Sequence, residues 1–227
     1  MNQPIAPRIL TDDLLLLAYG PDTGRPLADT NRLQCGLAGA LIAETVLAGL
    51  VAIDGDGRLH TTGSHRTGVP DVDGTAERVA AEPRPRKVKW WVQQLNKRQL
   101  RQHLLGRAVH VGVLTQQSHR VLRILPVETY RPEPEDRERA VWALHSVLMG
   151  YAAPDSRSAA LLAVVGAMRL DGKLFADVPA RERRKRLKAL ADRDDIGRAV
   201  RQVIQSIESA VAAVVVSSGG GDGGGGG

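Results

Sequence analysis

The chain has 227 residues, of which 43% are apolar, so it can bury a sizeable core in one domain or at most two. Aromatic residues make up only 3%, and a core of Leu, Val, Ile and Ala favours packed helices over a β-sandwich. The one cysteine, Cys35, excludes an intramolecular disulfide and a zinc site built from several thiolates. It is typical of a reducing, cytosolic compartment.

The formal net charge of +6 is distributed unevenly along the chain. Residues 81–131 contain 11 Lys and Arg against 2 Asp and Glu, a net charge of +9. Residues 1–80 contain 6 against 10, a net charge of −4. A local excess of this size indicates an anionic partner for the central segment.

A short apolar helix is predicted for residues 12–19, because Thr11 can cap its start and Gly20-Pro21 ends it. Residues 1–7 are predicted to be a flexible N-terminus. They lack the apolar segment of a secretory signal, so we expect the protein to stay inside the cell.

The apolar run over residues 33–53 approaches the length of a membrane span. A carboxylate such as Glu44 near its middle would cost about 2.5–3.5 kcal/mol in a bilayer. We therefore predict a buried core helix over residues 33–49, in which Gly36 and Gly39 allow a neighbouring element to come close. Glu44 could be a functional carboxylate, but a buried glutamate tied to a neighbouring donor is far more usual.

Residues 51–60 predict two short strands around the turn sequence Asp54-Gly-Asp-Gly. A calcium loop is the alternative, but an EF-hand needs a glutamate at its twelfth position, where this chain has His65. The polar, Gly-rich residues 61–73 that follow predict a loop.

Two helices, 75–81 and 88–110, are predicted next, separated by Pro83 and Pro85. Residues 113–126 then predict a second β-hairpin with residues 116–119 near its turn. The remaining chain predicts helices over 135–149, 158–170, 180–191 and 196–216, and a disordered Gly-rich tail over 217–227.

These elements predict a mainly helical, all-α protein. We expect a compact bundle of about eight or more helices around an apolar central helix, with one or two small β-hairpins. One ordered domain is expected to span residues 8–216.

Arg98 and Arg101 stand at i, i+3 in the predicted helix, so their guanidinium groups emerge from one face. Two such planar forks can grip a phosphate by bidentate hydrogen bonds, although a merely solvated basic face is the commoner outcome. Lys87 and Lys89 lie upstream, beside Trp90-Trp91. Adjacent helix residues point about 100° apart, so at most one of the two indoles can be fully buried. A tryptophan beside lysines is typical of a membrane surface, although a packed tryptophan is commoner.

Six of the eight residues 181–188 are basic. Such a run resembles a nucleic-acid or lipid patch, but Leu187 and Leu190 give it an apolar side, which is usual for a solvated helix face. The six histidines have no metal-binding spacing, and no nucleophile elbow or phosphate loop is present. We therefore expect no catalytic activity, cofactor or metal.

The order of these motifs resembles the Golgi phosphoprotein 3 family from about residue 8 to residue 216. The Ala-, Arg- and Gly-rich composition is typical of a bacterial relative. The resemblance rests on the following segments taken in order: Leu14-Leu-Leu-Leu-Ala, Gly36-Leu-Ala-Gly-Ala-Leu-Ile-Ala-Glu, Thr67-Gly, Trp90-Trp-Val, Arg98-Gln-Leu-Arg, Gly112-Val-Leu and Pro154-Asp…Leu161-Leu-Ala.

The resemblance implies a helical fold with a β-hairpin and a pocket for phosphatidylinositol 4-phosphate, in a peripheral membrane protein. Eukaryotic members also bind the cytosolic tails of Golgi glycosyltransferases. Two basic pocket positions fall on Arg98 and Arg101. Asp29 and Ala38 stand where eukaryotic members have a tryptophan and a further arginine, and Asp29 would repel a phosphate unless Arg32 or Lys97 offsets it. The family also implies self-association or membrane contact through the 113–126 hairpin.

The resulting hypothesis is a peripheral protein on the cytoplasmic face of a membrane that binds anionic phospholipid headgroups. The lipid would be phosphatidylinositol 4-phosphate or a bacterial anionic lipid. The residues expected at the membrane are Arg98, Arg101, Lys97, Lys87, Lys89 and Arg32 for the headgroup, and Trp90 and Trp91 for membrane contact. A nucleic-acid-associated helical protein that uses residues 84–107 and 181–188 is the alternative, because basic surfaces attract either anion. Under the lipid hypothesis no nucleic-acid partner is expected.

Overall fold

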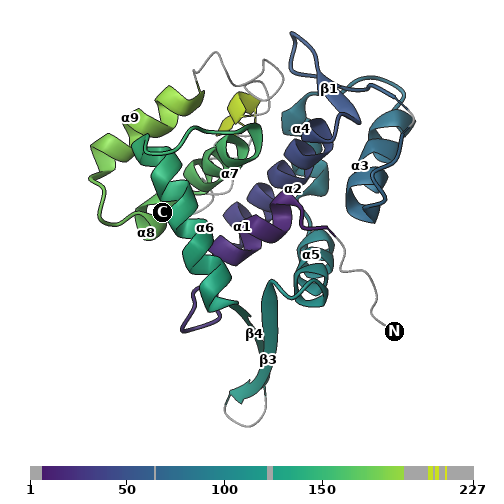
Figure 1. Ribbon diagram of the computed structural model, residues 1–227. Coiled ribbons are helices and arrows are strands. Elements are labelled where there is room, and N and C mark those ends of the chain that lie inside the picture. The colour runs from purple at the N-terminus through teal and green to yellow at the C-terminus, as the bar shows by residue number, and fades with distance from the viewer. Residues whose placement is uncertain are drawn as a thin grey trace, which may run out of the picture.

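The computed structural model describes residues 7–63, 65–121 and 125–191, together with 204–206, 208–209 and 213. Within these ranges the chain is mainly helical with two small antiparallel hairpins, which confirms the predicted fold class (Figure 1). The helices are α1 (Leu10–Ala18), α2 (Thr30–Leu47), α3 (Pro70–Ala81), α4 (Val88–Leu95), α5 (Arg98–His110), α6 (Pro134–Met149), α7 (Ser156–Ala167), α8 (Asp171–Leu174) and α9 (Ala180–Ala191). The strands are β1 (Val51–Ile53), β2 (Leu59–Thr61), β3 (Leu114–Val121) and β4 (Leu125–Pro132).

Helix α2 lies at the centre of the bundle and packs against α1, α3, α4, α5 and α7 (Figure 1). It begins at Thr30 because Asp29 caps it, accepting a hydrogen bond from the N–H of Arg32 at 2.9 Å. Most of its residues between Leu33 and Val46 are buried, as expected for a helix with apolar residues on every side. Within the described ranges, no helix is both long and apolar enough to cross a bilayer.

Gly36 is the point of closest approach between α2 and the end of α7, as the sequence predicted for this glycine. A Cβ atom placed on Gly36 would lie 2.0 Å from Sδ of Met168. Met168 is only 1% exposed, and its thioether occupies the space that a side chain at position 36 would need.

The first hairpin forms where it was predicted, with Val51 paired to Thr61 and Ile53 to Leu59. The Asp54 carboxylate closes its turn by accepting the backbone N–H groups of Asp56 and Arg58, both at 2.9 Å. This carboxylate is therefore engaged in the hairpin itself.

The second hairpin is longer than predicted, and its turn lies elsewhere. The register runs from Leu114↔Pro132 to Val121↔Leu125, so the chain reverses between Val121 and Leu125. Residues 116–119, predicted near the turn, lie within β3 instead. The strand projects from the body of the protein, and its residues Gln116, Gln117 and Ser118 are exposed or half-buried, which accounts for their polarity (Figure 1).

Two other predicted boundaries are wrong. The loop after β2 ends at Val69, because Pro70 starts α3 and Asp71 and Asp73 lie favourably in its first turn. The predicted helix 88–110 is two helices, interrupted at Asn96, whose backbone turns to φ −68° and ψ 71°. No glycine or proline marks this break in the sequence.

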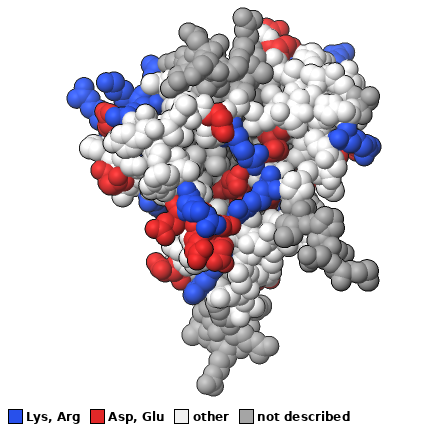
Figure 2. All heavy atoms as spheres, in the orientation of Figure 1, with Lys and Arg blue, Asp and Glu red and all other residues white. Residues whose placement is uncertain are grey.

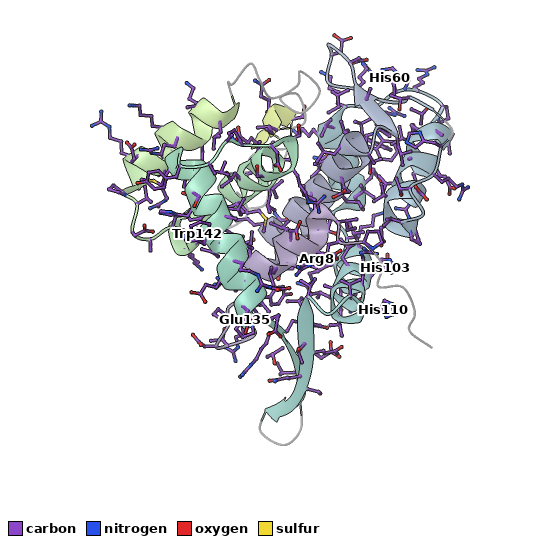
Figure 3. All side chains as sticks on the ribbon, in the orientation of Figure 1. Arg8, His60, His103, His110, Glu135 and Trp142 are labelled. Carbon is purple, nitrogen blue, oxygen red and sulfur yellow. The ribbon has the colours of Figure 1, made fainter. Side chains whose placement is uncertain are left out.

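Ion pairs hold the N-terminal segment against the bundle. On the face of the molecule drawn in Figure 2, charged atoms of both signs gather at the centre. Arg107 of α5 pairs with the buried Asp12 at 3.2 Å and donates to the carbonyl of Pro7 at 2.7 Å. Arg157 of α7 bridges Asp13 at 2.9 Å and Glu44 at 3.0 Å. Glu44 is thus a tied glutamate, the more usual of its two predicted states.

The predictions for the two chain ends fall largely outside the described residues. Outside them lie residues 1–6 of the N-terminus predicted to be flexible over 1–7, most of the helix predicted over 196–216, and the tail predicted to be disordered over 217–227. Residues 204–206 are helical, and Ile204 packs against Ala159 and Ala163 of α7.

Candidate functional site

The first turn of α5 has features that favour the binding of an anion. Lys97 precedes it without capping it, and the first turn contains no acidic residue. The first intrahelical bond is from the N–H of Arg101 to the carbonyl of Lys97 at 3.3 Å, so the preceding N–H groups point out of the helix start. Uncapped N–H groups together with the helix dipole favour a negative group at this position.

Arg98 and Arg101 both belong to this turn, as predicted, but their surroundings differ. Arg98 is exposed, whereas Arg101 is half-buried. The Nε atom of Arg101 is buried and has no hydrogen-bond partner among the described residues. Among the described residues, neither of the two arginines nor Lys97 forms a salt bridge, so all three positive charges remain available to a ligand.

Two tyrosines that the sequence did not indicate lie close enough to Arg101 to feel its charge. The rings of Tyr19 and Tyr130 meet edge to face, with centroids 5.8 Å apart. Burial raises the pKa of both phenols to about 12, and the nearby positive charge of Arg101 opposes this rise. Both rings therefore stay neutral at physiological pH, and the edge-to-face contact joins the β3–β4 hairpin to the end of α1.

Two asparagines join α5 to the start of α2. The Nδ2 of Asn96, two residues before Arg98, donates to Oδ1 of Asn31 at 3.1 Å. Asn31 lies beside Arg32, which pairs with Asp29 at 3.3 Å. The start of α2 thus lies next to the start of α5.

The charges of Asp29 and Arg32 largely offset each other, because the two side chains form a pair on the first turn of α2. Ala38, at the other position that departs from the family pattern, is fully buried in α2. It contributes no polar group to a surface site.

Lys97 has surroundings that the two arginines do not share. It lines a cavity of about 480 Å³ between α3, α4 and α5 together with Gln99 and His103, and neither Arg98 nor Arg101 is part of this lining. On a helix, Gln99 and His103 share one edge, while Arg98 and Arg101 share another. The cavity and the arginine pair are therefore separate features of the α5 N-terminus.

Lys87 and Lys89 do not converge with the arginines. Both are exposed at the start of α4, and Lys87 forms a β-bridge with Arg58 near the first hairpin. Eight residues of α-helix span about 12 Å, which separates these lysines from the start of α5. They belong to the same basic surface segment but not to one binding pocket.

Trp91 is a core residue, which corrects its prediction as a membrane contact. It is 4% exposed, and its ring is part of the hydrophobic core. Trp90 is half-buried, meets Trp91 edge to face at 4.9 Å and stacks with the guanidinium of Arg86 at 5.2 Å. Of the two predicted contacts, only Trp90 presents part of its ring at the surface, as the helical spacing required.

The described ranges contain no group of His, Cys, Asp and Glu residues arranged to hold a metal ion. The site at α5 offers guanidinium groups, an ammonium group and outward backbone N–H groups. These groups can bind and orient an anion by charge-assisted hydrogen bonds.

Sequence reasoning located the arginines but missed Tyr19, Tyr130, Asn31 and Asn96. Tyr130 lies 29 residues beyond Arg101, and Asn31 lies 65 residues before Asn96. Their proximity results from tertiary packing, for which the local sequence carries no signal.

Comparison with known proteins agrees with the motif order. A family model described as Golgi phosphoprotein 3 (GPP34) matches residues 10–207. This range includes every residue of the candidate site. No curated protein matches the chain.

Proposed function

Because the chain belongs to the Golgi phosphoprotein 3 family, we propose that it is a peripheral membrane protein that binds anionic phospholipid headgroups at the N-terminus of α5. The headgroup phosphate is held by Arg98 and Arg101, and Lys97 adds positive charge nearby. The family is not known for catalysis, and in this proposal the protein acts by binding.

The observation that carries the proposal is the buried Nε of Arg101, which has no hydrogen-bond partner among the described residues. A buried charged donor without a partner is costly, so such donors normally have a hydrogen-bond acceptor. A phosphate oxygen placed beside Arg101 supplies that acceptor. The uncapped α5 N-terminus favours the same negative charge from the backbone side.

Membrane affinity then comes from several modest contributions. Each basic residue near an anionic leaflet contributes about 1 kcal/mol, so the three basic residues at the start of α5 supply about 3 kcal/mol. Lys87 and Lys89 lie farther out and strengthen the attraction at long range, whereas Asp29 offsets much of the charge of Arg32. This attraction weakens as salt shortens the Debye length.

Asp29 lowers the positive charge beside the proposed site, so we propose only the general class of the headgroup. Its carboxylate stands at the start of α2 and takes up part of the charge of Arg32. We therefore propose an anionic phospholipid as the ligand, with phosphatidylinositol 4-phosphate as the family's default. The corresponding location is the cytoplasmic face of a membrane.

Liposome co-sedimentation tests the proposal. We expect the wild type to bind vesicles of phosphatidylcholine with anionic lipid and not vesicles of phosphatidylcholine alone. The double variant Arg98→Ala/Arg101→Ala should bind at least about tenfold more weakly, because it loses two charge-assisted contacts.

The matched control is Arg181→Ala/Lys185→Ala, which removes the same charge from exposed positions of α9. It should bind nearly as well as the wild type. Equal losses in both double variants would mean that net charge alone drives binding, and this would refute a site at α5. A gel shift with DNA at physiological salt, without vesicle binding, would replace the proposal by the nucleic-acid alternative.

A further inference from the structure

Helix α9 carries the second basic segment of the chain, and the proposed lipid site does not use it. Lys and Arg side chains gather over this helix, away from α3 (Figures 1 and 2). Two of these side chains bind other groups of the protein itself. Arg183 binds Asp171 at 3.0 Å, and Arg186 donates to the carbonyl of Met149 at 2.7 Å. The other basic residues of α9 are exposed and comprise Arg181, Arg184, Lys185 and Lys188.

The four exposed residues divide into two pairs with different surroundings. Arg184 and Lys188, at i, i+4, line a cavity of about 910 Å³ between the end of α7, α8 and α9. Arg169, which follows α7, lines the same cavity. Arg181 and Lys185 share the same spacing but are not part of its lining. Within the described part of the chain, Arg169, Arg184 and Lys188 form no salt bridge.

Arg169 occupies a backbone position that normally belongs to glycine. It follows the last turn of α7 with φ 58°, the left-handed region that side chains with a Cβ rarely adopt. The N–H of Leu170 bonds the carbonyl of Val165 at 2.9 Å, which is the usual helix end around a left-handed residue. An arginine in this conformation is strained relative to glycine. Such strain is a reason to look for a function of the side chain.

The charge of the cavity wall indicates the ligand. Arg169, Arg183, Arg184 and Lys188 line the cavity against Asp171 and Glu208, a net charge of +2. Arg183 and Asp171 already pair with each other, so the rest of the charged lining consists of three cations and Glu208. A dianion with several acceptor oxygens, such as a phosphomonoester, matches this set in charge and in hydrogen-bonding capacity.

We propose that the cavity between α7, α8 and α9 is a second anion site, which binds a phosphomonoester group through Arg169, Arg184 and Lys188. The phosphomonoester belongs either to a lipid headgroup or to a soluble phosphate compound. The site is independent of Arg98 and Arg101, because no residue is shared between them.

Binding of inorganic phosphate tests the site directly. Thermal unfolding is followed with increasing phosphate, and sodium chloride keeps the ionic strength constant. Phosphate should raise the melting temperature of the wild type, because a ligand that binds only the folded state stabilises it. The variant Arg184→Ala/Lys188→Ala should bind phosphate about 10- to 100-fold more weakly. The charge-matched control Arg181→Ala/Lys185→Ala should bind like the wild type.

A second variant separates binding from folding. Arg169→Gly relieves the left-handed strain, so its melting temperature without phosphate should equal or exceed that of the wild type. Its response to phosphate should nevertheless weaken. A variant that is no less stable but loses the ligand cannot be explained by misfolding.

Vesicles distinguish the two sources of the phosphomonoester. In the Arg98→Ala/Arg101→Ala background, which removes the first site, binding to phosphatidylcholine vesicles is compared with and without phosphatidic acid. Binding that depends on phosphatidic acid and on Arg184 and Lys188 assigns a lipid headgroup. A response to inorganic phosphate alone assigns a soluble compound. The proposal is overturned if neither probe binds, or if the control pair loses as much affinity as the cavity pair.

Discussion

The contact between Gly36 and Met168 allows a quantitative test of how α2 and α7 pack. In Gly36→Ala the new Cβ would lie 2.0 Å from Sδ and 2.7 Å from Cγ of Met168. Because Met168 is buried, its side chain cannot move into solvent. Overpacking costs about 1–3 kcal/mol, whereas alanine in a helix interior gains about 1 kcal/mol over glycine. The expected net loss is about 1 kcal/mol in the free energy of unfolding.

A double-mutant cycle isolates the steric part of this cost. Met168→Ala alone should lose about 2–5 kcal/mol through the cavity it leaves. In that background Gly36→Ala should stabilise the protein by up to about 1 kcal/mol, because only the helix-propensity gain remains. Urea unfolding followed by circular dichroism gives all four values. If Gly36→Ala destabilises the protein equally in both backgrounds, the steric explanation is wrong.

Two carboxylate contacts give further predictions. Backbone and side-chain hydrogen bonds from Thr67 lower the pKa of Asp73 below its ordinary 3.8, so the stabilisation they provide is present above that value and is lost as the pH falls through the folded-state pKa. Asp73→Asn should therefore cost about 1–3 kcal/mol at pH 7, and its difference from the wild type should shrink in urea unfolding at pH 3. A difference that stays constant between the two pH values would contradict this. Arg157→Met should cost about 1–3 kcal/mol by leaving Asp13 and Glu44 without their cation, and adding Glu44→Gln should recover part of the loss in the melting temperature. No recovery in the double variant would show that the arginine acts mainly through packing.

The sequence predicted best where a single physical signal dominated. The mostly apolar residues between Leu33 and Val46, interrupted by Glu44, favoured a buried helix over a membrane span, and α2 is that buried helix. Helix α9 has the predicted limits, because Pro179 marks the start of a sustained helical pattern. The Asp54-Gly-Asp-Gly turn likewise carries its own chemistry, since the Asp54 carboxylate closes it.

Errors occurred where tertiary contacts decided the outcome. The break at Asn96 has no glycine or proline, and its side chain is held by Asn31 from a distant helix. The turn of the second hairpin was misplaced because polar residues in an exposed strand resemble turn residues.

For the site, the i, i+3 spacing identified the arginine pair but could not show which member is buried. The structure gives that role to Arg101, whose neighbours Tyr19 and Tyr130 come from two other elements. Nor could the spacing show that Asp29, an apparent obstacle to phosphate, caps α2 and pairs with Arg32.

The interruption between α4 and α5 affects how this region tolerates changes in length. In one continuous helix, inserting a single residue rotates every later side chain by about 100° relative to the earlier ones, which would turn Arg98 and Arg101 away from their neighbours. At Asn96-Lys97 the chain leaves helical geometry, so the directions of the α5 side chains are not fixed by those of α4. The linker is thus the position where the orientations of the tryptophan pair and the arginine pair can diverge independently during evolution, as long as the hydrogen bond from Asn96 to Asn31 is kept.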